Sequence, residues 1–156
     1  SRTSIFDYIG VPNHQRWMNG GKFDGGQLSQ VEKDLRDFYK RLLNFSIDSS
    51  ALMGSYQEIQ GFNRQNTVGF DAGIYAFIRW SETQKLIVIT NFSWLTASNF
   101  SLKIPSDIIQ KWNLKDGFYT LTDQLYKKSS IQLQVLNGEG NVSISIAPSE
   151  SFIYQL

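Results

Sequence analysis

The sequence predicts a mainly β protein: an antiparallel two-sheet Greek-key sandwich of about eight strands, preceded by a loop and one α-helix. Three observations lead to this prediction. Apolar and polar residues alternate in several short segments between residues 55 and 156, as they do in strands with one buried face. Turn residues separate these segments at intervals of about ten residues. One earlier segment has the apolar period of a helix.

The amino-acid composition excludes several classes of function. The 156 residues include no cysteine, so disulfides, thiolate metal sites and cysteine nucleophiles are excluded. Lysine and arginine number 15 and aspartate and glutamate 14, a balance that argues against a nucleic-acid-binding protein, whose affinity depends on a basic surface. Aromatic residues make up 14% of the chain, which favours a packed globular domain. No apolar run approaches the length of a membrane span.

Residues 1–28 are predicted to be a structured loop. Apolar side chains are scattered among glycines and asparagines without a sustained period, and only Asn13 to Met18 suggest a helical turn. A loop of this length is usually functional or belongs to another domain. The chain starts at Ser1, its first methionine is Met18 and no signal segment opens it, so we expect a piece of a longer protein.

Residues 29–45 are predicted to be a helix. Ser29 and Glu32 form a capping box, in which each side chain satisfies a free amide at the helix start. Acidic residues come early and basic residues late, which suits the helix dipole. The apolar stripe recurs at helical intervals and consists of Val31, Leu35, Phe38 and Leu42, widened by Tyr39 and Leu43.

Residues 46–156 are predicted to form the β-sandwich domain. The turn residues Asn137-Gly138 and Gly140-Asn141 separate two of its strands. A short helical turn is expected from Pro105 to Trp112, and the apolar run 86–89 suits a strand covered on both sides. The expected strands are 56–62, 73–80, 86–89, 99–104, 117–124, 131–135, 142–146 and 152–156.

The single histidine, His14, lacks the partners of a catalytic relay, because no nucleophile motif accompanies it. We expect a surface or hydrogen-bonded histidine. One histidine without cysteine nearly excludes zinc, and the chain holds neither an EF-hand loop nor a phosphate-binding glycine motif. Asp24, beside Gly25 and Gly26, is a weak candidate for an ion ligand. No cofactor and no metal site are therefore predicted.

Glycoside hydrolysis needs two carboxylates that face each other across a sugar. The sequence marks out no such pair. Most of its 14 acidic residues lie on the predicted helix or beside turn residues, as Asp71 and Asp116 do. No catalytic residue is assigned.

Four tryptophans are many for this length, and an exposed indole face can stack on the apolar face of a sugar ring. The candidate carbohydrate-binding residues are Trp17, Trp94 and Trp112. The alternative is that the tryptophans fill the core, which we favour for Trp80 and Trp94 because they lie in or beside strands. Trp17 and Trp112 lie outside strands, and for them both interpretations stay open.

Several short motifs, taken in order, resemble the end of an α-amylase superfamily enzyme of glycoside hydrolase family 13. The helix at 32–43 and the segment SALMGSY at 50–56 resemble the last barrel helix and the turn that opens the C-terminal β domain. IYAFIRW at 74–80 and LIVITNFS at 86–93 resemble a strand pair of that domain. The resemblance continues with DGFY at 116–119, APSESFIY at 147–154 and, before the helix, the loop segments 4–8 and 17–26, which look like the chain after barrel strand eight in bacterial members.

The resemblance implies a parent enzyme that acts on α-glucans with retention. In that family the nucleophilic aspartate, the acid/base glutamate and a third aspartate lie at the ends of barrel strands four, five and seven. No position of this chain matches them, so we expect the chain itself to be inactive. The lack of cysteine fits a cytoplasmic, periplasmic or secreted parent.

Two functions are then expected for the chain. The first is a non-catalytic accessory domain whose partner is the missing catalytic barrel, which it supports. The alternative is a surface module that binds α-glucan through exposed tryptophan or tyrosine faces; an independent enzyme is a remote third. Without the barrel, the apolar stripe of the helix is expected to fold onto the sandwich or to pair with a second chain as a homodimer.

Overall fold

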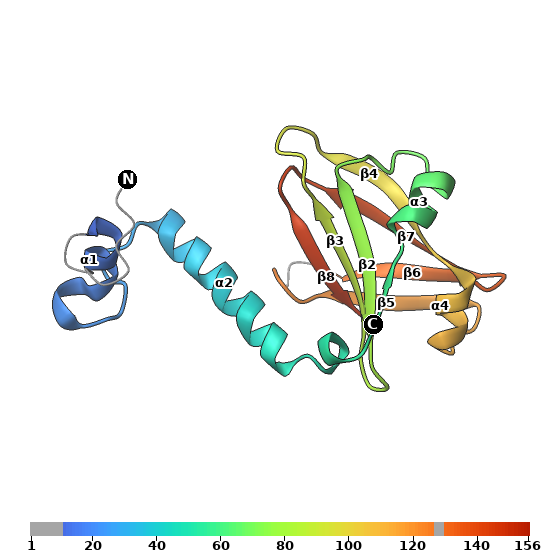
Figure 1. Ribbon diagram of the computed structural model, residues 1–156, viewed down its shortest axis with the longest axis horizontal. Helices are drawn as coiled ribbons and strands as arrows, with labels where there is room; N and C mark the ends of the chain where they lie inside the picture. Colours follow the sequence, from blue (N-terminus) through green and yellow to red (C-terminus); the bar gives the residue numbers. More distant parts are fainter. Residues whose placement is uncertain (1–10, 127–129) are drawn as a thin grey trace. The chain divides into compact units, whose positions relative to one another are not determined.

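The computed structural model describes residues 11–126 and 130–156. The chain divides between Asn44 and Phe45 into two compact units. Helices joined by a loop form the described part of the first unit, and an eight-stranded sheet dominates the second (Figure 1). No helix among the described residues is long and apolar enough to cross a membrane.

The first unit contains α1 (Pro12–Met18), the 3-10 turn η1 (Asn19–Gly21) and most of α2 (Gln30–Asp48). α1 confirms the predicted helical turn. Pro12 suits its start, since proline at the first helical position lacks only an amide that would have no partner there. Asn19 ends the helix in the left-handed conformation, with φ of 45°.

The capping box of α2 forms as predicted. The backbone N–H and the hydroxyl of Ser29 each donate to the Glu32 carboxylate at 2.8 Å, and the Glu32 N–H points back at the Ser29 hydroxyl at 3.4 Å. The Arg16 guanidinium pairs with the same carboxylate and so ties α1 to α2. The Ser29 amide first and Arg16 second lower the pKa of Glu32 to about 2.

The apolar stripe of α2 is largely exposed. Val31, Leu35, Tyr39 and Leu43 are all exposed, and no residue of the helix is buried. Ile47 continues the stripe, because the helix extends three residues beyond its predicted end. The expectation that another surface covers this stripe stays a prediction.

The second unit confirms the mainly β prediction. Its strands pair antiparallel in the order β1-β2-β3-β8-β5-β6-β7-β4. The strands are β1 (Ser55–Glu58), β2 (Ile74–Trp80), β3 (Lys85–Asn91), β4 (Ser98–Ile104), β5 (Gly117–Asp123), β6 (Ser130–Leu136), β7 (Glu139–Ile146) and β8 (Ser151–Gln155). The short helices are η2 (Ser50–Met53), α3 (Gln60–Asn66) and α4 (Ser106–Lys111).

The two layers of the predicted sandwich are halves of one curled sheet. β5 and β8 pair only through Thr122 with Gln155 and Asp123 with Tyr154. This short contact joins the half β1-β2-β3-β8 to the half β5-β6-β7-β4, and the sheet curls there (Figure 1). The joint exists because β8 pairs with β3 along its length and reaches β5 with its last residues.

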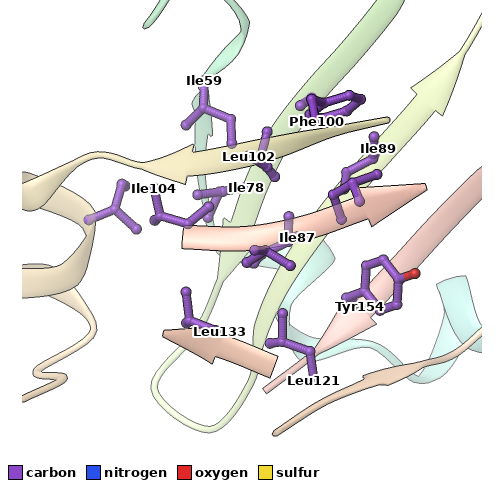
Figure 2. Close-up of a cluster of buried hydrophobic side chains, with 14 of the residues drawn as sticks. Ile59, Ile78, Ile87, Ile89, Phe100, Leu102, Ile104, Leu121, Leu133 and Tyr154 are labelled. Carbon is purple, nitrogen blue, oxygen red and sulfur yellow. The ribbon is translucent and has the colours of Figure 1, made fainter. Parts of the chain in front are cut away.

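The core lies between the two halves. Figure 2 shows Ile78, Ile87 and Ile89 from one half meeting Leu102 and Leu133 from the other. The predicted alternation is confirmed in β4 and β7, where every second residue is buried. Each fully buried isoleucine or leucine contributes about 1.5–3 kcal/mol to folding.

One predicted strand is partly wrong. The segment 56–62 stops being a strand after Glu58, because α3 begins at Gln60. The buried side chain of Asn63 holds this helix in place: its amide donates to the carbonyls of Ile59 and Lys103 at 2.9 Å, and its oxygen accepts from the Lys103 N–H at 2.8 Å. A tertiary contact with β4 therefore overrides the local strand pattern.

Candidate functional site

Trp112 does not fit the role of a sugar platform. Only 3% of it is exposed, and it belongs to the core cluster of the β domain. It caps the C-terminus of α4, whose Ile108 and Ile109 are also buried. A sugar ring needs an open indole face, so the candidate role of Trp112 as a stacking residue is corrected to a core role.

Trp94 does not fill the core, contrary to the interpretation that we favoured. It is 81% exposed, between Phe92 at 73% and Leu95 at 79%. The loop that carries them is fixed by the buried Asn91, whose amide donates to the carbonyls of Thr96 at 2.8 Å and Ala147 at 3.1 Å. Three large apolar side chains are thus held in solvent by an ordered loop.

Trp17 is half-buried in the first unit. Its ring meets Phe23 edge to face at 5.6 Å between centroids. Together with His14 and Met18 these residues line a cavity of about 480 Å³. His14 lines this cavity but is exposed, which agrees with the surface histidine expected from the sequence.

A groove in the β domain combines aromatic and polar side chains. Its volume is about 730 Å³, and we call it the Trp80 groove. Three segments far apart in the sequence form it: Gly54 and Ser55 at the start of β1, residues 80–85 around the β2–β3 turn, and residues 111–113 at the end of α4. Sequence patterns could not reveal this site, because the fold alone brings these segments together.

The walls of the Trp80 groove are fixed by local contacts. The β2–β3 turn is closed by the Ser81 N–H, which donates to the Gln84 carbonyl at 2.8 Å. On the α4 side, the Lys111 ammonium lies 5.8 Å from the centroid of the Trp80 ring, a cation–π distance. The same ammonium donates to Asp107 and to Gln57 at 2.9 Å, and the contact with Lys111 lowers the pKa of Asp107.

Trp112, which lines this groove, carries a buried polar atom without a partner. Its indole Nε1 is one of two buried side-chain polar atoms without a hydrogen-bond partner among the described residues, the other being Arg16 Nε. An indole N–H usually finds an acceptor when it is buried. Other atoms of Trp112 line the groove, whereas this nitrogen is itself buried.

The outer face of β1 and β2 carries an aromatic cluster that sequence reasoning missed. Tyr56 and Tyr75 each lie 5.6 Å from the Phe77 ring, and their hydroxyls share a hydrogen bond of 2.8 Å, which raises the pKa of Tyr56. Arg79 extends the cluster and donates to the carbonyl of Leu52. The alternation of Tyr75, Phe77 and Arg79 with buried neighbours was the available signal.

Many carboxylates of the chain accept hydrogen bonds from backbone amides. Asp71 accepts from the Gly73 N–H, and Asp116 accepts from the amides of Asn137 and Gly138. Asp24, the weak ion candidate, accepts from the Gly26 N–H at 2.8 Å and from Asn19 at 2.7 Å. Further examples are Glu32, Glu58, Asp123 and Glu150. These groups stabilise turns and helix starts, and no cluster of three potential metal ligands occurs within residues 11–126 and 130–156.

Solved structures share this fold. AmyP in complex with maltotriose matches 85% of this chain and 23% of its own, with a TM-score of 0.52 and 18% sequence identity. An α-amylase from Anoxybacillus matches 87% of this chain and 25% of its own, with a TM-score of 0.51 and 14% identity. The maltogenic α-amylase AmyB from Thermotoga neapolitana matches 76% of this chain and 24% of its own, with a TM-score of 0.51 and 8% identity.

The chain therefore spans about a quarter of the length of these structures. The likeness shows that this chain shares its fold with part of these α-amylases. No protein-family model matches the chain, and no curated protein matches it in sequence.

Proposed function

We propose that this chain is the non-catalytic accessory part of an α-glucan-active glycoside hydrolase and that it supports the catalytic barrel of that enzyme. The observation that carries the proposal is the match of most of this chain to about a quarter of solved α-amylases. The hydrogen bonds that the carboxylates accept are consistent with the non-catalytic role. A retaining hydrolase needs two carboxyl groups free to act on one sugar, whereas Asp71, Asp116 and Asp123 are engaged by backbone amides.

If the chain supports the barrel, two of its apolar surfaces are explained as contact surfaces. The stripe of α2 exposes several large apolar side chains, and the Tyr56 cluster on the outer face of the sheet exposes Tyr56 beside the half-buried Tyr75 and Phe77. Exposed apolar patches of this kind mark interaction sites. In the intact enzyme, Leu35 and Leu43 of the stripe pack against the barrel, and the β domain shields the apolar end of that barrel.

A product assay tests the non-catalytic part of the proposal. The chain is incubated with maltoheptaose and with soluble starch, and new reducing ends are counted. We expect none above the buffer control. Release that scales with the amount of chain, and that disappears when one carboxylate is replaced by its amide, would overturn the proposal.

A second candidate function is α-glucan binding through the loop that carries Phe92 and Trp94. The favouring observation is their exposure on a loop that Asn91 fixes, because a rigid aromatic side chain loses little entropy on binding. The test is a maltoheptaose titration of the chain and of Trp94→Ala. This function predicts saturable binding that Trp94→Ala removes, and it fails if the variant binds as well as the unchanged chain.

A further inference from the structure

We propose that the Trp80 groove binds a neutral sugar unit, as a second carbohydrate site distinct from the Trp94 loop. The choice of an α-glucan as the sugar rests on the proposed function, whereas the choice of a neutral polyhydroxylated ring rests on the groove itself. Its volume of about 730 Å³ falls in the range of small-molecule sites, about 300–1,000 Å³.

Trp80 supplies the apolar surface of the site. The residue is half-buried: it packs against the core and also lines the groove. Lys111 and the core restrain the indole, so the ring is ordered before any ligand arrives. An ordered aromatic surface binds a ring with little loss of side-chain entropy.

The polar side chains of the groove suit a neutral ligand. Lys85 and Lys111 are positive, while Glu82 and Asp107, the partner of Lys111, are negative. These charges balance, so the groove favours neither an anion nor a cation. Lysine donates hydrogen bonds, glutamate accepts them, and Asn113 does both, which matches the mixed donors and acceptors of sugar hydroxyls.

The frame of the groove is preorganised. Gly54 lies against the backbone of Trp80, and the Ser81 hydroxyl accepts from the amides of Thr83 at 3.3 Å and Gln84 at 3.1 Å. The backbone of Asn113 takes the left-handed conformation, with φ of 52°. These features position the polar groups without help from a ligand.

The test is a maltoheptaose titration of the whole chain, followed by tryptophan fluorescence and by heat. Trp80→Ala is expected to weaken binding at least about tenfold, the loss typical of a central aromatic contact. Because Trp80 also packs on the core, Asn113→Gly serves as the second variant: it removes the amide and keeps a residue that accepts the positive φ. It is expected to weaken binding severalfold, at an unchanged melting temperature.

The matched control is Phe118→Ala, which removes an exposed aromatic side chain that does not line the groove and should bind like the unchanged chain. The proposal is overturned if Asn113→Gly binds as tightly as the unchanged chain, if Trp94→Ala alone abolishes binding, or if the folded chain binds no maltoheptaose at millimolar concentration. Displacement of the sugar by millimolar inorganic phosphate would also overturn it, because that outcome assigns the groove to anions. None of these results depends on the product assay. The proposal of a sugar site in the groove and the proposal of a non-catalytic role can therefore be refuted independently.

Discussion

Gly54 lies so close to Trp80 that a Cβ atom on the glycine would stand 2.1 Å from the carbonyl oxygen of the tryptophan. The contact is between backbones, and neither side can rotate away. It joins the segment that enters the β domain to the end of β2. The same contact forms one wall of the Trp80 groove.

The first prediction concerns this contact. Gly54→Ala forces the backbones apart, and we expect it to lower the free energy of unfolding by about 1–3 kcal/mol. Denaturant unfolding measures the change. The matched control is Gly61→Ala in α3, whose new Cβ meets only the flexible carboxylate of Glu58 at 3.2 Å. Equal stability of the two variants would refute the account of this contact.

The second prediction concerns the buried amide of Asn63. Asn63→Ala leaves the carbonyl and amide of Lys103 without their partner, and we expect a loss of about 3 kcal/mol. Asn66→Ala on the same helix removes only an exposed bond to the Phe62 carbonyl and should cost less than about 1 kcal/mol. Thermal unfolding of both variants decides between a tertiary and a merely local role for Asn63.

The third prediction is a loss of stability of the first unit in acid. The pKa of Glu32 is about 2 in the folded chain, whereas its ordinary value is 4.5. The ionised carboxylate therefore contributes fully to the stability of the fold above pH 4.5. As the pH falls from 4.5 through 2, the carboxylate protonates and the contribution disappears. An NMR titration of the Glu32 carboxyl measures this. Arg16→Ala should raise the pKa only partly, because the Ser29 amide is the larger cause; a midpoint near 4.5 in the unchanged chain would contradict the account.

The fourth prediction is a loss of stability of the β domain in alkali. Burial first, and the nearby Asp123 charge second, raise the pKa of Tyr154 from 10.0 to about 12. The unfolded chain therefore releases this proton first, and stability falls as the pH rises from 10 through 12. Tyrosinate absorbance shows the late titration. Tyr154→Phe should flatten the alkaline loss, and an unchanged profile in that variant would count against it.

Sequence patterns predicted the parts of the fold that depend on interactions between near neighbours in the chain. The start of α2 follows from Ser29 and Glu32, which are near neighbours in the chain. The helix continues to Asp48 because no glycine or proline stops it after Phe45. By contrast, the pattern at 56–62 predicted a strand, but α3 begins at Gln60 because of the long-range bonds of Asn63.

The candidate site was less predictable because contacts between residues distant in the sequence determine it. Trp112 turns into the core because α4 buries its apolar face, and Trp94 is exposed because buried Asn91 shapes its loop. Neither fact follows from the neighbours of these residues in the sequence. The Trp80 groove unites three distant segments, so only the folded chain reveals it.

The support role is tested most directly by sedimentation of the chain over a range of concentrations. If the stripe of α2 exists to be covered by a larger partner, the isolated chain should associate reversibly through it. Leu35→Glu combined with Leu43→Glu should restore a monomer, whereas Val68→Glu, at an exposed apolar residue of the β domain, should not. An unchanged chain that stays monomeric at every concentration would contradict the account.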